Sequence, residues 1–130
     1  MSYDGAMTSN VSSDSGLSKF HRLLVEQVRH EFTASHQYVA IAAWFDAQDL
    51  PQLARVFYEQ SLEERDHAMM IVRYLLDMDV DFDLPGVDEI VTNFSTPRDL
   101  VALALRQERE VSAQFQLLAK VARDEEEYTG

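Results

Sequence analysis

Residues 53–78 read LARVFYEQSLEERDHAMMIVRYLLDM, and the spacing within this stretch decides the fold. Positions at alternating steps of four and three form one series: Leu53, Phe57, Gln60, Glu64, His67, Ile71, Tyr74 and Met78. Such steps gather side chains on one face of an α-helix, so the stretch predicts a long helix with a core-facing stripe. Glu64 and His67 form a Glu-x-x-His pair near its middle, and their three-residue spacing directs both side chains to one place.

Two further long helices are predicted on either side of this one. Residues 17–46 contain neither Pro nor Gly and carry apolar groups at helical spacing. The central helix, residues 51–78, is expected to begin after Asp49 as its N-cap, with Pro51 in the first turn. The third helix, residues 97–124, begins at a Ser-Thr-Pro sequence. Each helix of roughly 28 to 30 residues would be roughly 42 to 45 Å long.

The two connections between these helices differ in length. Only a few residues separate the first two helices, which forces an antiparallel hairpin. Residues 79–96 join the second helix to the third, and these roughly 18 residues could reach roughly 59 Å, enough to return along the whole bundle. The predicted fold is therefore all-α, an up-down helical bundle with one long crossover.

Each predicted stripe carries an acid near its middle. The stripe of the first helix has a spacing of seven: Leu17, Leu24, Glu31, Tyr38 and Phe45. The stripe of the third helix has its acid among apolar residues: Val101, Leu105, Glu108, Val111, Phe115, Leu118 and Ala122. None of the 11 Lys and Arg residues falls on any of the three stripes. Carboxylates that face a core without a cation are costly to bury, so another partner is expected.

Glu31, Glu64, His67 and Glu108 are therefore candidate metal ligands. Iron, manganese and zinc suit carboxylate and imidazole ligands, and a bound cation offsets the cost of burying them. A hydrogen-bonded core histidine and core glutamates satisfied by tyrosine or water are the alternative interpretations. The coincidence of all four residues at one level favours metal. Tyr38 either packs in the core or hydrogen-bonds a ligand carboxylate.

Composition excludes several classes of function. The 130 residues have the usual size of one domain, and 11 Lys and Arg against 23 Asp and Glu give a formal charge of -12. This charge argues against nucleic-acid and membrane partners. The absence of cysteine excludes disulfides and iron–sulfur clusters. Residues 1–16, rich in Ser, Gly and Asp, are expected to form a flexible tail without a signal peptide, before one cytoplasmic domain, residues 17–130.

Three segments resemble the metal-bearing helices of non-haem bacterial ferritins of the actinobacterial type: EFTASHQYVAIAAWF at 31–45, LEERDHAMMIV at 62–72 and ALALRQEREV at 102–111. The resemblance covers residues 17–130 and the first three helices of the subunit. It implies a ferritin-like bundle whose di-iron centre is held by the four candidate ligands with Tyr38 beside them. It further implies a ferroxidase that uses dioxygen or peroxide, a mineral core and a homo-oligomeric shell of 24 subunits. Glu63 matches an accessory iron position.

This sequence differs from those of related metal-binding families, and the differences exclude some of their metal groups. Arg65 follows Glu64 where bacterioferritin-like chains place a haem-ligating methionine, so no haem is expected, and a chain without cysteine cannot build the Cys-x-x-Cys sites of rubrerythrins. The family's fourth helix, which supplies a Gln or Glu to the metal site, is absent from this chain.

Two alternative functions remain open. One is a truncated assembly module that binds metal without turnover, and the other is a di-iron oxygenase, which should show a second Glu-x-x-His.

Overall fold

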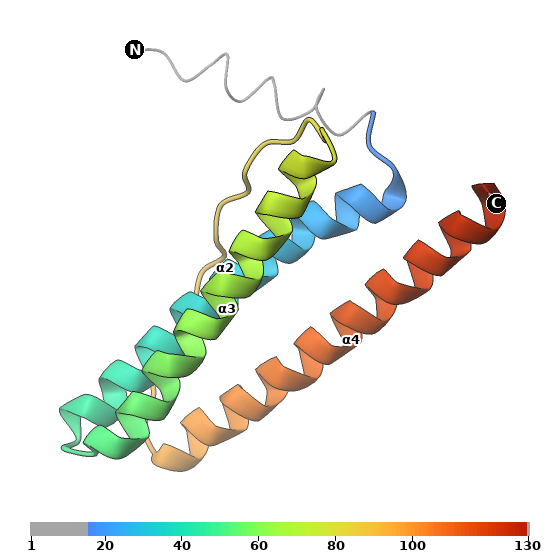
Figure 1. Ribbon diagram of the computed structural model, residues 1–130. Coiled ribbons are helices and arrows are strands. Elements are labelled where there is room, and N and C mark those ends of the chain that lie inside the picture. The colour runs from blue at the N-terminus through green and yellow to red at the C-terminus, as the bar shows by residue number, and fades with distance from the viewer. Residues whose placement is uncertain (1–15, 130) are drawn as a thin grey trace, which may run out of the picture.

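The computed structural model describes residues 16–129, and nearly all of the predicted tail, residues 1–15, lies outside them. The described part of the chain is all-α, which confirms the predicted fold class. Its three helices are α2 (Lys19–Ala47), α3 (Pro51–Asp77) and α4 (Pro97–Thr129). Figure 1 shows α2 and α3 as an antiparallel hairpin with α4 beside it. None of these helices is apolar enough over a sufficient length to cross a membrane.

Capping interactions set where the helices begin and end. Ser18 caps α2 by accepting a hydrogen bond from the backbone of His21 at 3.1 Å. The predicted N-cap of α3, Asp49, is wrong, because the N-cap is Leu50. Asp49 instead has a φ of 59° and ends α2, while the Leu50 amide donates to the carbonyl of Phe45 at 3.0 Å. This is the Schellman arrangement, in which a short polar residue tolerates the left-handed conformation.

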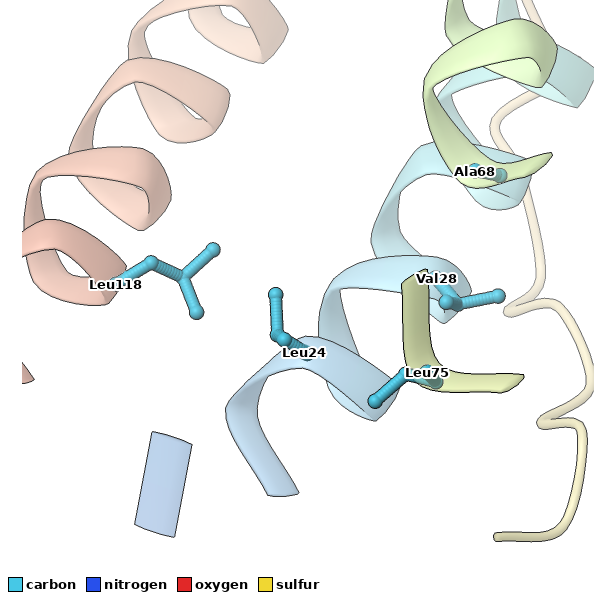
Figure 2. Close-up of a cluster of buried hydrophobic side chains, with 5 residues drawn as sticks. All are labelled: Leu24, Val28, Ala68, Leu75 and Leu118. Atoms are coloured by element: carbon cyan, nitrogen blue, oxygen red, sulfur yellow. The ribbon is translucent and has the colours of Figure 1, made fainter. Parts of the chain in front are cut away.

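The buried core lies in two clusters at opposite ends of the bundle. One cluster unites residues of all three helices: Leu24, Val28, Ala68, Leu75 and Leu118. Figure 2 shows Leu118 of α4 directed toward Leu24 of α2. The other cluster surrounds the α2–α3 turn and the start of α4: Tyr38, Ile41, Phe45, Ala54 and Leu100. Glu31 and Glu64 lie between the two clusters, where the core becomes polar.

The buried face of α2 is the predicted one, but those of α3 and α4 are rotated. Leu24, Glu31, Tyr38 and Phe45 are buried as expected. The buried residues of α3 are Ala54, Ser61, Glu64, Ala68 and Leu75; three of them are small, and only Glu64 belongs to the predicted stripe. Small side chains allow α3 to lie close to α2, which turns Leu53, Tyr74 and Met78 of the predicted stripe toward solvent. Among the described side chains of α4, Leu100, Leu118 and Val121 are buried.

The arrangement of the helices explains this rotation. Within the described residues, close backbone approach joins α2 to α3 and α2 to α4, but not α3 to α4. Both α3 and α4 therefore bury the edge of their apolar face that meets α2 and expose the other edge. Val101, Leu105 and Phe115 of the predicted α4 stripe are exposed for this reason. Figure 1 shows α4 diverging from α3 toward its C-terminal end, where Glu125 still accepts a hydrogen bond from the backbone amide of Phe20 in α2 at 3.1 Å.

The crossover, residues 78–96, returns along α2 as predicted and is fastened to it at several points. The side chain of Gln37 exchanges two hydrogen bonds of 2.8 Å with the backbone of Val91. The backbone amide of Asp88 donates to Thr33 at 3.0 Å, and the Asp88 carboxylate pairs with Arg29. These contacts lead the chain from the end of α3 to the start of α4 (Figure 1).

Candidate metal centre

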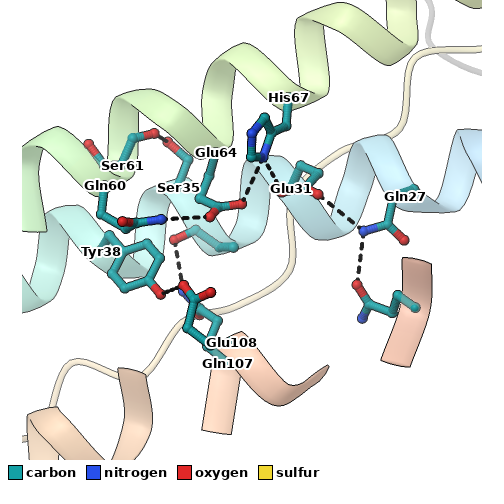
Figure 3. Close-up of polar contacts among 12 residues, drawn as sticks. Gln27, Glu31, Ser35, Tyr38, Gln60, Ser61, Glu64, His67, Gln107 and Glu108 are labelled. Carbon is teal, nitrogen blue, oxygen red and sulfur yellow. Dashed lines mark hydrogen bonds and ion pairs between the residues drawn. The ribbon is translucent and has the colours of Figure 1, made fainter. Parts of the chain in front are cut away.

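Three of the four candidate ligands meet between α2 and α3. Glu31, Glu64 and His67 each offer a ligand atom, and these atoms lie within 4.8 Å of one another. The Nδ1 atom of His67 is 3.9 Å from Glu31 Oε2 and 3.6 Å from Glu64 Oε2. Figure 3 shows both carboxylates directed toward the imidazole. Such a separation leaves room for a cation, because metal–ligand bonds of about 2.0 to 2.2 Å would span it.

Local sequence brings these side chains together. Glu64 and His67 lie one turn apart on α3, so they project in nearly the same direction. Glu31 faces them from the middle of α2. Ser61, one turn before Glu64, accepts a hydrogen bond at its carbonyl from the Ser35 hydroxyl at 2.7 Å, which joins the helices beside the site. Residues with short side chains thus set the close helix spacing that three ligands from two helices require.

The two carboxylates are buried, whereas the imidazole reaches solvent. Glu31 is 0% and Glu64 3% exposed, while the side chain of His67 is 48% exposed. Burial raises the pKa of Glu31 to about 9, and the neighbouring Glu64 carboxyl contributes further to this increase. In the described part of the chain neither carboxylate pairs with Lys or Arg. The site therefore offers acids without a protein cation to balance them.

One oxygen of each buried carboxylate has no hydrogen-bond partner. These atoms are Glu31 Oε2 and Glu64 Oε2, the same oxygens that face His67. Buried polar atoms are nearly always satisfied, and two exceptions on facing groups call for a common explanation. A bound divalent cation would explain both unpaired oxygens, because it neutralises both acids at once and binds carboxylate oxygen strongly.

The fourth candidate ligand, Glu108, lies outside this group of three. It is exposed on α4, and its Oε1 accepts a hydrogen bond from the hydroxyl of Tyr38. Tyr38 is buried and stacks on Phe57 with the ring centroids 5.9 Å apart. Burial, followed by the hydrogen bond to Glu108, raises the pKa of Tyr38. Tyr38 therefore links Glu108 to the core beside the site, while Glu63, the accessory candidate, is exposed and apart from the group.

A cavity of about 330 Å³ opens beside Tyr38 and Glu108. Residues of all three helices line it: Tyr38, Val56, Phe57, Gln60, Val101, Ala104, Leu105 and Glu108. Five of the lining residues belong to the stripes predicted for α3 and α4: Phe57, Gln60, Val101, Leu105 and Glu108. Glu108 thus lies at the mouth of a largely apolar space between α3 and α4.

Sequence reasoning assigned no role to two glutamines that contact the carboxylates. The Nε2 atom of Gln27 donates to Glu31 Oε1 at 3.3 Å, and that of Gln60 donates to Glu64 Oε1 at 3.0 Å. Gln60 was on a predicted stripe, but Gln27 was not. A repeated signal was present in the sequence, because each glutamine precedes its acid by four residues and so lies one helical turn away.

Comparison with known proteins agrees with this fold. The family model described as a ferritin-like domain matches residues 21–130. Ferritin BfrB of Mycolicibacterium smegmatis is 60% identical over 113 residues, which are 87% of this chain and 62% of that protein. Ferritin BfrB of Mycobacterium tuberculosis is 55% identical over the same shares of both chains. The crystal structure of apo-ferritin from Pseudo-nitzschia multiseries has a TM-score of 0.79 at 27% identity, covering 85% of this chain and 71% of that one.

The chain therefore belongs to the ferritin family. Its resemblance to the non-haem bacterial ferritins, with the chain covering only part of the subunit, is confirmed. The chain spans about 62% of the length of the mycobacterial ferritins that it matches.

Proposed function

We propose that this chain is part of an iron-storage subunit, in which Glu31, Glu64 and His67 bind Fe(II) for oxidation to Fe(III). The observation that carries the proposal is the pair of buried carboxylate oxygens that lack a hydrogen-bond partner and face one imidazole. Membership of the ferritin family supports iron as the ion. In this proposal residues 17–130 form a ferritin-like di-iron domain.

Glu108 and Tyr38 complete the proposed centre. Glu108 is the proposed ligand of a second iron, and Tyr38, which donates to its carboxylate, is the proposed catalytic residue beside the ions. Iron is here the substrate. Each Fe(II) loses one electron to dioxygen or peroxide, and the Fe(III) passes to a mineral. The subunits are proposed to assemble in the cytoplasm as a homo-oligomeric shell of 24 subunits, without haem and without nucleic-acid or membrane partners.

Metal titration combined with oxygen consumption tests this function. Zn(II), and Fe(II) without oxygen, are titrated into the chain in a calorimeter, and dioxygen consumption is then recorded per Fe(II) added. Replacing Glu64 and His67 with Ala is expected to abolish tight binding and oxygen consumption. Glu59→Ala, which removes an exposed acid from the same helix, is the matched control and should leave both unchanged. Undiminished metal stoichiometry in the double variant would contradict the assignment.

A second function, metal binding without turnover, is favoured by one observation. Glu108 is absent from the group of three ligands, so the described residues gather side chains for one cation and not for two. The same titration separates the two functions. A stoichiometry of two irons with oxygen consumption supports the ferroxidase, whereas a single bound metal without oxygen consumption supports the binding module.

A further inference from the structure

The two buried acids of the site share one hydrogen-bonding pattern. In each helix a glutamine one turn earlier donates its amide to the Oε1 atom of the acid: Gln27 to Glu31 in α2, and Gln60 to Glu64 in α3. In both acids the other oxygen, Oε2, remains unpaired and faces His67. Figure 3 shows the two glutamines at opposite sides of the site, with the acids between them. Each carboxylate thus has one occupied oxygen and one available oxygen.

The amide of Gln27 is itself held by α4. Its Nε2 atom also donates to Gln114 Oε1 at 2.9 Å, so the two N–H groups of the amide have different partners. Gln27 is buried, and the orientation of its amide is therefore fixed from both sides. Through this chain of hydrogen bonds, α4 contacts Glu31 although Glu108 lies outside the group of ligands.

We propose that Gln27 and Gln60 are positioning residues that hold one oxygen of Glu31 and Glu64 and so present the other oxygen to a metal ion beside His67. The inference rests on the proposed metal site. A neutral amide orients a carboxylate without reducing its negative charge, whereas Lys or Arg at the same place would weaken the attraction for a cation. The hydrogen bond to Oε1 favours metal binding through Oε2, because binding through both oxygens would compete with the amide for Oε1.

The hydrogen bonds can be tested without metal. In protein labelled with nitrogen-15, the exchange rate of the Gln60 side-chain amide with water is measured by NMR in the wild type and in Glu64→Ala. The exchange is expected to become faster in the variant, because the amide loses its acceptor. An exchange rate unchanged by Glu64→Ala would show that the hydrogen bond does not hold the two side chains together, and the inference would be overturned.

Metal affinity tests the positioning role itself. Gln60→Met and Gln27→Met keep similar volume but remove the amide, and each is expected to weaken Zn(II) binding by about 10- to 100-fold, the usual effect of losing a hydrogen-bond partner of a ligand. Gln52→Met, at an exposed position in the first turn of α3, is the control and should bind as the wild type does. Melting temperatures of the metal-free variants identify any general loss of structure.

The visible spectrum of bound Co(II) separates positioning from a general effect on structure. If the released carboxylate turns to bind through both oxygens, the coordination number of Co(II) rises and its absorption per bound ion falls. This decrease is expected in Gln60→Met and not in Gln52→Met. A wild-type chain that binds no metal overturns the metal site itself. A wild type that binds, with affinity and spectrum unchanged in Gln60→Met, overturns only the positioning role.

Discussion

At the scale of single residues, the site is defined by acids that the protein buries without a cation. Glu31 and Glu64 would be unfavourable in a core made only for packing, since each leaves an oxygen unsatisfied. Their neighbours are neutral amides and a partly exposed imidazole. The residues around the acids therefore supply no positive charge to balance them. In the metal-free protein burial instead favours a bound proton on Glu31, which gives the stability a measurable dependence on pH.

The metal-free protein is expected to lose stability as the pH rises from about 4.5 to about 9. The folded state raises the pKa of Glu31 from 4.5 to about 9, so within this window it binds a proton that the unfolded state has released. Stability falls where the folded state binds more protons, with a slope of up to about 1.4 kcal/mol per pH unit for one group. Denaturant titrations with a chelator measure it, and Glu31→Gln should flatten the dependence. An equal slope in Glu31→Gln would show that other groups are responsible.

Tyr38→Phe is expected to slow iron oxidation with a modest loss of stability. The variant keeps the ring that stacks on Phe57 but removes the hydroxyl that donates to Glu108. A hydrogen bond to a charged group contributes about 1.5 to 3 kcal/mol, and the exposure of Glu108 places this one toward the lower end. The denaturation midpoint and stopped-flow oxidation of Fe(II) measure the two effects. Tyr58→Phe, which removes an exposed hydroxyl bonded to Asp46, is the control. Equal oxidation rates in both variants would exclude a role for the Tyr38 hydroxyl.

At the scale of the elements, the sequence predicted the existence and length of the helices better than their rotation. Apolar residues at steps of three and four define a helix with one broad apolar face. They do not show which edge of that face packs against another helix of the chain and which edge is exposed to solvent. The buried face of α3 is set by Ala54, Ser61 and Ala68, whose small size permits close approach to α2. Asp49 was misassigned because an aspartate serves equally as an N-cap and as a left-handed residue that ends a helix.

The candidate site was also predicted from helical spacing. That spacing indicated which residues of α2 and α3 lie close together, but not where the candidate ligand of α4 lies. Glu31 and the Glu64–His67 pair come together because the stripe of α2 and the local spacing in α3 were assigned correctly. The position of Glu108 depends on how α4 packs, which no local pattern specifies. The role of Gln27 depends on Gln114, a residue 87 positions later in the chain. Contacts between residues so far apart in the sequence depend on tertiary packing, which local spacing does not specify. The role of each candidate residue as a metal ligand stays a prediction.

Removing the hydrogen bonds of one buried side chain, Gln37, is expected to loosen the crossover and so to destabilise the fold. Gln37→Leu removes both hydrogen bonds to Val91 and leaves its backbone amide and carbonyl without these partners, which typically costs about 1 to 3 kcal/mol. Arg29→Ala, which breaks an exposed ion pair to the same segment, should cost less, at most about 1 kcal/mol. Denaturant unfolding and limited proteolysis within residues 78–96 measure both. A larger loss of stability in Arg29→Ala than in Gln37→Leu would contradict this prediction.

At the scale of the whole molecule, the exposed edges of α3 and α4 form an apolar strip on a strongly acidic protein. Leu53 and Val56 on α3, with Val101 and Leu105 on α4, are all exposed. Contiguous apolar surface of this kind usually marks an interface or a tendency to aggregate. The formal charge of -12 opposes close approach of unassisted copies. The strip and the charge therefore act in opposite directions on self-association.

Covering this strip is expected to raise both stability and oxidation rate. An amphipathic helix joined after Gly130, or assembly with another chain, would bury the strip and exclude water from the flank of the site, where small errors of position cost much of the rate. Analytical ultracentrifugation with stopped-flow oxidation of Fe(II) measures the outcome. An appended helix of the same length with a polar face is the control. A stable monomer of about 15 kDa that oxidises iron as fast as the extended form would contradict the expectation.

Among the described helices, the backbone of α4 approaches only α2, so we expect α4 to detach while the α2–α3 hairpin stays folded. Such partial opening exposes less surface than global unfolding and needs less free energy. Native-state hydrogen exchange should accordingly find faster exchange for backbone amides in α4 than for those in the middle of α2. Each opening would also separate Gln114 from Gln27 and release the amide that orients Glu31. The lifetime of a bound ion would then follow the opening rate of a helix that contributes none of the three gathered ligands.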